Sequence, residues 1–330
     1  MKRSGLKVRR KKSYLMLSAL VALILSISAS CSIPYLMQAA RGHLQIMHSR
    51  QPILRILESD TVDDYKKAKL QMVEDVHQFA INELGLPDNK SFTTYADIGR
   101  PYPGWNVYAA PETSLEPKTW CYPVAGCVVY HGYFARDKAV QYASKLKSQG
   151  YDVYISPFTA YSTRGWFKDP VLSNHLRYDS VSLAGLVIHE LAHQKFYYPD
   201  DSRVSESFAV TVERAGVIEW LESIGRYDRA SEAEKSWEKE DDFITRLFDF
   251  KKELKKIYMS GLDEKTILQK KDSILNLTSE SLKIDRIKLN NAFFVPVSTY
   301  NSLVPEFMAM LDSCGGDFGE FYGMIEKKYK

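Results

Sequence analysis

Two histidines and a glutamate in the stretch LAGLVIHELAHQ, residues 183–194, are of the right types for metal chemistry. His189 and His193 are four residues apart, so a helix would place both imidazoles on one face, where they can bind a single ion. Imidazole suits zinc, and Glu190 beside the first histidine can serve as a general base. The surrounding residues are apolar, and unpartnered polar side chains in a buried helix would be costly. We therefore expect one Zn²⁺ ion here; the alternative is a metal-free helix whose histidines are solvated or hydrogen-bonded.

A third protein ligand is expected from the helix that follows, because catalytic zinc has three protein ligands and a water. The next helical pattern, residues 203–223, offers Glu206, Glu213 and Glu219. Spacing alone allows either Glu206 or Glu213. These two are seven residues apart and share a helix face, so one can bind the metal while the other supports the second ring nitrogen of a ligand histidine.

The second half of the chain, which must position these groups, has mostly helical patterns. Residues 181–196 are apolar on several sides and predict a buried helix. Beyond residues 203–223, two further regions are predicted to be helical: the charge-rich stretch 228–285, with a break at Gly261, and residues 306–328, in pieces around Gly315 and Gly316.

The first half changes character along its length. Apolar residues at helical spacing predict a helix over 34–58 and another from about Thr61 to residue 84. Aromatic and β-branched residues among Gly and Pro predict strands over 91–135, followed by a helix over 136–149 and a strand over 151–156. We therefore expect an α+β fold with a small, aromatic-rich mixed sheet. The predicted regions are a helical N-terminal layer over 31–90, the sheet over 91–160 and the helical metal-binding region over 161–330, the last two forming one compact unit.

The composition excludes several classes of protein. The chain has 330 residues, 45% hydrophobic and 26% charged, which is ordinary for a globular protein and unlike collagen, coiled coils or disordered chains. The formal net charge is +3, but seven basic residues and no acidic one precede Cys31, so the rest of the chain is slightly acidic. Nucleic acid is therefore not an expected partner.

The first thirty residues have the parts of a signal peptide. A basic run is followed by the apolar stretch YLMLSALVALILSI and by small residues before Cys31. Small residues before a cysteine resemble a bacterial lipobox, although Ser28 stands where Leu is usual. We expect export to the periplasm and a lipid anchor on Cys31, with Ser32 favouring the outer membrane. The alternatives are an uncleaved N-terminal membrane anchor and ordinary cleavage.

The remaining cysteines agree with export. Cys121 and Cys127 lie close together in WCYPVAGC and can pair across a turn in an oxidising compartment. The alternative is two buried free thiols. Cys314 has no obvious partner in the sequence.

The segments HELAHQ and SESFAVTVE resemble those of the gluzincin metallopeptidases, in particular their large aminopeptidases. The resemblance implies a zincin-like metallopeptidase core with Glu206 as the third zinc ligand, and it places Glu213 where those enzymes also have a Glu. The interval between His193 and Glu206 is shorter here than in those enzymes. The segments WCYPVAGCVVYHGYF, YSTRGWFKDPVL and CGGDFGEFY extend a closer resemblance, to a family of bacterial predicted aminopeptidases that are often lipoproteins.

The resemblance implies hydrolysis of periplasmic peptides by zinc-activated water, with Glu190 as the base. Four candidates for the donor that stabilises the oxyanion are Tyr161, His175, Tyr178 and Tyr300. The segment YSTRGWF corresponds to the strand that binds the peptide backbone in gluzincins, with Tyr161, Ser162, Thr163, Arg164 and Gly165 as the candidate residues.

The substrate class is left open between three hypotheses. The segment YSTRGWF contains no glutamate to hold a free amino terminus; Asp169 is a candidate replacement, or else a turn residue before Pro170. Besides an aminopeptidase, the sequence allows a zinc endopeptidase or a non-catalytic, peptide-binding envelope lipoprotein. It predicts neither side-chain preference nor oligomeric state.

Overall fold

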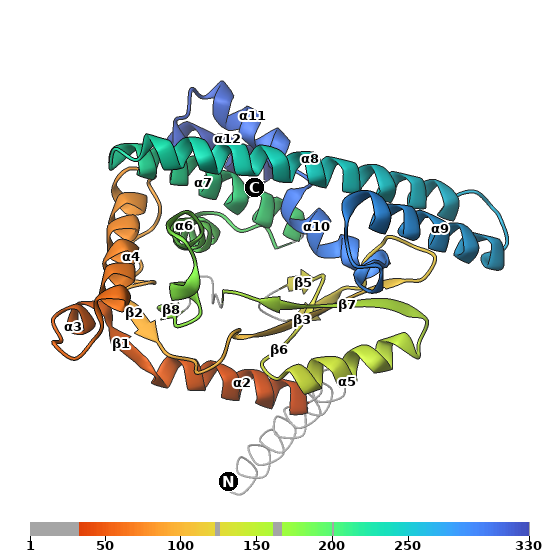
Figure 1. Ribbon diagram of the computed structural model, residues 1–330, viewed down its shortest axis with the longest axis horizontal. Helices are drawn as coiled ribbons and strands as arrows, with labels where there is room; N and C mark the ends of the chain where they lie inside the picture. The colour runs from red at the N-terminus through yellow and green to blue at the C-terminus, as the bar shows by residue number, and fades with distance from the viewer. Residues whose placement is uncertain (1–32, 123–125, 161–166, 200, 330) are drawn as a thin grey trace, which may run out of the picture. The chain divides into compact units, whose positions relative to one another are not determined.

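The computed structural model describes residues 33–122, 126–160, 167–199 and 201–329 (Figure 1). The chain divides into two compact units, residues 1–48 and 49–330. The first unit contains helix α2 (Ile33–His48). The expected signal peptide and Cys31 lie outside the described residues. In the part of the chain that is described, no helix is both long enough and apolar enough to span a bilayer.

A three-stranded antiparallel sheet with the order β6-β3-β7 lies within the second unit. Because β6 and β7 both run antiparallel to β3, helix α5 is a crossover between two strands of the same direction. Figure 1 shows α5 on one side of this sheet and α10 on the other. Side chains alternate between the two faces of a strand, so Tyr108 and its pairing partner Tyr154 pack toward α10 with Val295. The bounds are β3 Gly104–Pro111, β6 His131–Tyr133, β7 Tyr151–Phe158 and α5 Arg136–Lys147.

A second small sheet has mixed pairing. Strand β2 (Thr94–Ala96) pairs antiparallel with β1 (Arg50–Pro52) and parallel with β8 (Val171–Leu172). Strand β1 corrects the single helix expected over 34–58. The residue before a proline disfavours the α conformation, so the chain is extended up to Pro52 and a new short helix, α3 (Ile53–Leu57), begins after it. Strands β4 (Trp120–Tyr122) and β5 (Gly126–Val128) pair with each other.

The other helices follow the predicted pattern, with small shifts at their ends. The helix expected from Thr61 begins after Asp63, whose carboxylate accepts a hydrogen bond from the backbone N–H of Lys66. Gly261 lies between two long helices and has a positive φ, as a helix break requires. The bounds are α4 Asp64–Asn82, α6 Ser180–Lys195, α7 Ser202–Ser223, α8 Tyr227–Tyr258, α9 Glu264–Leu282, α10 Phe294–Asn301, α11 Val304–Ser313 and α12 Phe318–Tyr329, with 3-10 turns η1 His175–Arg177, η2 Arg286–Lys288 and η3 Asn291–Phe293.

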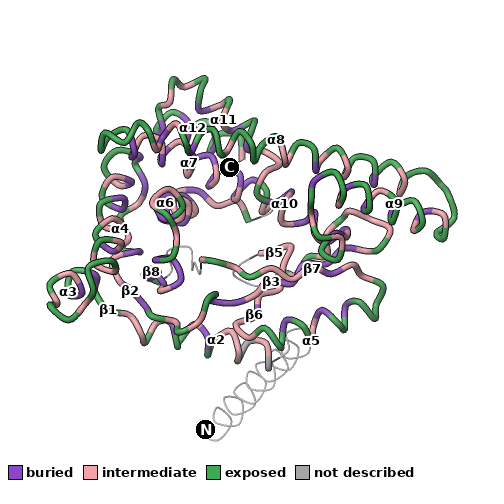
Figure 2. Tube along the Cα trace, viewed as in Figure 1, coloured by how far each residue is buried: buried purple, intermediate pink, exposed green. Residues whose placement is uncertain are grey.

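The main core forms where α6 and α7 pack against each other and against α4, α11 and α12. Helix α6 is buried on several sides, as its apolar sequence predicts, whereas α8 is exposed along most of its length (Figure 2). Gly216 lets the helices approach closely, because an added Cβ would lie 2.5 Å from Leu84 Cδ1 and 3.3 Å from Ile188 Cγ2. The helical core and the small sheets confirm the α+β fold class. The predicted region boundaries stay predictions.

Candidate metal centre and active site

Helices α6 and α7 carry the candidate metal ligands, and an aspartate side chain caps the N-terminus of each helix. The Asp179 carboxylate accepts from the backbone N–H of Ser182 at the start of α6, and the Asp201 carboxylate accepts from that of Arg203 at the start of α7. The connection between these helices is short, so they pack side by side. His189 and His193 on α6 therefore face Glu206 on α7.

Three donor atoms from these side chains converge on one point. His189 Nε2 lies 3.1 Å from His193 Nε2, and Glu206 Oε2 lies 3.4 Å and 3.3 Å from these two nitrogens. A tetrahedral zinc ion with ligand distances of about 2.0–2.1 Å has about 3.3–3.4 Å between neighbouring ligand atoms. The triangle of donor atoms therefore has the dimensions of one face of a zinc tetrahedron.

The hydrogen bonding of Glu206 also fits a metal ligand. Its Oε2 atom is buried and has no hydrogen-bond partner, although two ring nitrogens lie close to it. An unsatisfied buried carboxylate oxygen is costly unless an ion compensates it. Among the residues that the structure describes, His189, His193 and Glu206 form a group that can hold a metal ion.

Glu213, the other candidate ligand, contacts a different atom. Its Oε2 lies 2.9 Å from His189 Nδ1, which donates the hydrogen bond and so leaves Nε2 free to bind a metal. Gly185 on α6 makes room for this carboxylate, because a Cβ at that position would lie 2.7 Å from Glu213 Oε1. A glycine inside an otherwise apolar helix is the one sequence signal of this role.

The carboxylates govern the protonation of the site. Burial alone would lower the pKa of His189, but Glu206 and Glu213 raise it well above the ordinary 6.5. Burial would raise the pKa of Glu206, but the neighbouring charge of His193 and the contacts with His189 lower it well below 4.5. With Glu190, three carboxylates surround two imidazoles, and this excess of negative charge suits a cation.

Glu190 lies beside the donor atoms without contributing to the triangle. Its side chain is buried, and Oε2 has no hydrogen-bond partner. Its charge acts on both His189 and Tyr300, so the carboxylate lies near both of these groups. A buried, unpaired carboxylate oxygen in this position can accept a proton from a water molecule or a ligand.

Of the three oxyanion candidates that the structure describes, Tyr300 lies beside the group formed by His189, His193 and Glu206. Its ring stacks on His189, with 6.3 Å between the centroids and 27° between the planes. The charge of Glu206, with burial as a second cause, raises the pKa of Tyr300 well above 10, so the phenol keeps its proton. A protonated phenol beside the donor atoms can donate a hydrogen bond to a ligand there.

His175 and Tyr178 have structural partners instead. His175 Nδ1 accepts from the backbone N–H of Leu172, and its Nε2 donates to the carbonyl of Thr159. Burial lowers the pKa of His175 to about 4. Tyr178 stacks on the His175 ring. Both rings therefore support the chain that leads into α6.

Much of the expected substrate strand falls outside the described residues. Tyr161, Ser162, Thr163, Arg164 and Gly165 are all among these, so their proposed contacts stay predictions. Asp169 is fully buried, and its backbone N–H donates to Ser91 Oγ while its carbonyl accepts from the N–H of Phe92. These bonds join Asp169 to the segment before β2, and both roles offered for Asp169 stay predictions.

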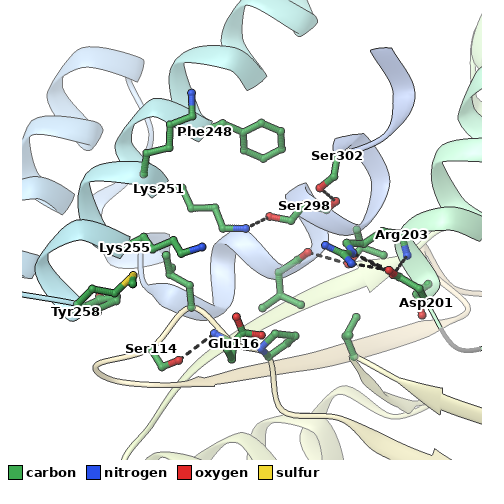
Figure 3. Close-up of a pocket in the computed structure, with 18 of the residues that line it drawn as sticks. Ser114, Glu116, Asp201, Arg203, Phe248, Lys251, Lys255, Tyr258, Ser298 and Ser302 are labelled. Atoms are coloured by element: carbon green, nitrogen blue, oxygen red, sulfur yellow. Dashed lines mark hydrogen bonds and ion pairs between the residues drawn. The ribbon is translucent and has the colours of Figure 1, made fainter. Parts of the chain in front are cut away.

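A large cavity lies beside the start of α7, one helical turn before Glu206, and no local sequence pattern indicates it. It has a volume of about 880 Å³ and is lined by residues of α8, α10, the start of α7 and the loop after β3 (Figure 3). Lys251 and Lys255 project into it from α8. Lys251 is half-buried there, whereas Lys255 is exposed.

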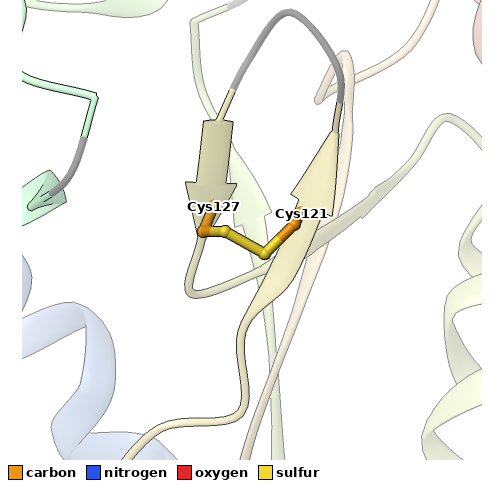
Figure 4. The surroundings of a disulfide bond; sticks show 2 residues. All are labelled: Cys121 and Cys127. Carbon is orange, nitrogen blue, oxygen red and sulfur yellow. A yellow bond between two sulfur atoms is a disulfide. The ribbon is translucent and has the colours of Figure 1, made fainter.

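Cys121 and Cys127 form a disulfide across the β4–β5 hairpin (Figure 4). They are directly opposite each other in the register of the two strands. An added Cβ at Gly126 would lie 3.2 Å from the Pro199 carbonyl, so the hairpin packs close to the connection between α6 and α7. Cys314 is a free cysteine.

The comparisons with known proteins give one match. A family model described as "Putative aminopeptidase" matches residues 34–329. No curated protein and no solved structure matches the chain. The match spans the helices that carry His189, His193 and Glu206, the aromatic sheet and the C-terminal helices.

Proposed function

The chain belongs to the family described as "Putative aminopeptidase", and on this premise we propose that it is a zinc-dependent metallopeptidase that removes residues from the N-termini of peptides. Membership of the family indicates peptide hydrolysis. Our proposal adds to this the zinc ion, the roles of the individual residues and the aminopeptidase specificity.

One observation carries the choice of zinc chemistry. The two histidine nitrogens and the Glu206 oxygen are 3.1–3.4 Å apart, and that oxygen is buried without a hydrogen bond. Two imidazoles and one carboxylate are the ligand set of several catalytic zinc sites. His189, His193 and Glu206 would hold the ion.

The peptide-bond chemistry then divides between the ion and the side chains. Bound zinc lowers the pKa of a water molecule and polarises the scissile carbonyl. Glu190 Oε2 accepts a proton from the attacking water and returns it to the nitrogen of the leaving amine. Its burial without a hydrogen-bond partner supports this role, because nothing competes for the proton-accepting oxygen.

Two further side chains assist. Glu213 accepts the hydrogen bond of His189 Nδ1–H, which holds the imidazole in the tautomer that binds a metal through Nε2. Tyr300, stacked on His189, donates a hydrogen bond from its hydroxyl to the developing oxyanion. Loss of an oxyanion donor typically lowers kcat by about 100- to 1,000-fold.

The test combines metal analysis with a panel of peptides. The purified protein should contain one zinc ion per chain and should cleave peptides with a free amino terminus. Glu190→Gln should retain zinc and lose turnover, whereas the exposed Glu222→Gln on α7 is the matched control and should behave as the parent.

Three results would contradict parts of the proposal. A folded, zinc-loaded sample that binds peptides without cleaving them would favour a peptide-binding lipoprotein. Cleavage by Glu190→Gln at the parental rate would remove Glu190 as the base. Equal cleavage of acetylated and free peptides would replace the aminopeptidase by an endopeptidase.

We also propose that the protein is exported and lipid-anchored through Cys31. The basic run, the apolar stretch and the small residues before Cys31 support this location. Metabolic labelling with palmitate should mark the parent and leave Cys31→Ser unlabelled. Labelling of both proteins, or of neither, would contradict the anchor.

A further inference from the structure

The cavity in Figure 3 begins one helical turn before Glu206 along α7. Ser202 lines the cavity and is four residues before Glu206 on α7, so the two side chains share a helix face and lie about 5–6 Å apart at Cβ. A ligand bound at His189, His193 and Glu206 would therefore reach the cavity along the start of α7.

Basic side chains from two helices line this cavity. Lys251 and Lys255 project from α8, and Arg203 lies at the start of α7 (Figure 3). Lys251 Nζ donates to Ser298 Oγ at 2.5 Å and forms no ion pair with a carboxylate of the described residues. Burial, together with the charges of Arg203 and Lys255, lowers the pKa of Lys251.

The acidic groups of the lining compensate this charge only in part. Asp201 is held by Arg203 through two hydrogen bonds to the guanidinium Nε and an ion pair of 2.5 Å. Glu116 is exposed on the loop after β3, and its charge acts on Lys251 without an ion pair between the two. The ammonium groups of Lys251 and Lys255 therefore remain available to an anion.

The remaining lining suits a peptide better than a small inorganic ion. Leu115, Phe248 and Val295 supply apolar surface, and Ser298 and Thr299 supply hydroxyls. A volume of about 880 Å³ lies within the usual range of about 300–1,000 Å³ for organic ligand sites.

We propose that this cavity binds a carboxylate of the peptide substrate through Lys251 and Lys255. The inference rests on the proposed peptidase function and adds a substrate class to it, namely peptides with a negative charge a few residues from the scissile bond. The carboxylate has two sources, the C-terminus of a short peptide and an Asp or Glu side chain.

Kinetic measurements with matched peptides separate these sources. Alanine peptides of two to five residues are compared as free acids and as C-terminal amides, and amidated peptides containing Glu are compared with their Gln counterparts. At one length or position, the carboxylate should lower KM by about tenfold, the effect of a charge-assisted hydrogen bond.

Variants on α8 assign the effect to the cavity. Lys255→Gln and Lys251→Met should each reduce the ratio of KM for the amide to KM for the acid several-fold. Lys255 is exposed, so its replacement leaves the core intact. Lys256→Gln is the matched control, since Lys256 is exposed on the same helix and pairs with Glu253.

Binding measurements distinguish failure of this inference from failure of the proposed function. Calorimetry with Glu190→Gln, which should not turn over, compares the same acids and amides. Tighter binding of the acids that is lost in a Glu190→Gln, Lys255→Gln double variant supports the cavity even if the parent hydrolyses nothing. Equal KM and equal binding for every charged and neutral pair would overturn the inference, as would a preference that survives both lysine substitutions.

Discussion

Replacing Gly185 with alanine tests whether the close contact between α6 and α7 supports metal binding through Glu213 and His189. Gly185 is neither a predicted metal ligand nor a predicted catalytic residue. Its missing side chain leaves room for Glu213, which in turn accepts the hydrogen bond of His189 Nδ1 at 2.9 Å. A methyl group at this position should therefore weaken metal binding from a distance.

The size of the effect follows from the contact distances. The new Cβ would lie 2.7 Å from Glu213 Oε1, so that oxygen must retreat by about 0.7 Å to reach the 3.4 Å of ordinary van der Waals contact. A carboxylate that moves as a unit would stretch its 2.9 Å bond to His189 beyond the limit of a good hydrogen bond. Loss of such a supporting bond typically lowers metal affinity about 10- to 100-fold.

The assay is zinc affinity by competition with a fluorescent chelator, with urea unfolding measured in parallel. Gly323→Ala is the matched control, because Gly323 is also helical and a Cβ there would meet no atom within 4 Å. Alanine is favoured over glycine inside a helix by about 0.5–1 kcal/mol, so Gly323→Ala should be as stable as the parent or slightly more so, with unchanged zinc affinity.

A folded Gly185→Ala protein with the zinc affinity of the parent would refute this reasoning. A second check uses non-additivity. In a Glu213→Gln background, where the bond is already weakened, Gly185→Ala should cost much less additional affinity. Equal losses in both backgrounds would mean that Gly185 acts through something other than Glu213.

Three other predictions concern the ligands, pH and the disulfide. Glu206→Ala should abolish stoichiometric zinc binding, whereas Glu213→Ala should only weaken it; metal analysis after dialysis would reassign the ligand if the order were reversed. Burial lowers the pKa of His175 from 6.5 in the unfolded chain to about 4 in the folded chain. Below pH 6.5 the unfolded chain therefore binds a proton that the folded chain does not bind. The free energy of unfolding should fall by roughly 3 kcal/mol by pH 4. His175→Gln should flatten this part of the urea-stability profile, and an unchanged slope would exclude His175 as its cause. Replacing both Cys121 and Cys127 with serine should lower the free energy of unfolding by about 2 kcal/mol, the loop-closure value for so short a loop, and an unchanged urea midpoint would contradict it.

The sequence determined the local parts of the site. His189 and His193 share a face because any α-helix brings residues four apart together, and the apolar residues around them make that helix a buried one. Cys121 and Cys127 are so close in the chain that a hairpin suffices to pair them. The two long helices around Gly261 likewise follow from local pattern and from a glycine that accepts a positive φ.

Choosing between contacts required the tertiary structure. Glu206 and Glu213 share one face of α7, so their spacing in the sequence does not show which of them reaches the histidine Nε2 atoms. The packing of α7 on α6, with its close approaches at Gly185 and Gly216, places Glu206 opposite Nε2 and Glu213 opposite Nδ1.

The same reason explains what the sequence left undetermined beyond the ligands. Tyr300 was one candidate among four, and the packing of α10 against α7 is what brings its ring onto His189. Lys251 and Arg203 are far apart in the chain and line one cavity because α8 crosses over the start of α7 and α10. Periodicity specifies which face of a helix is apolar, but the neighbours of a polar side chain depend on how the helices pack against one another.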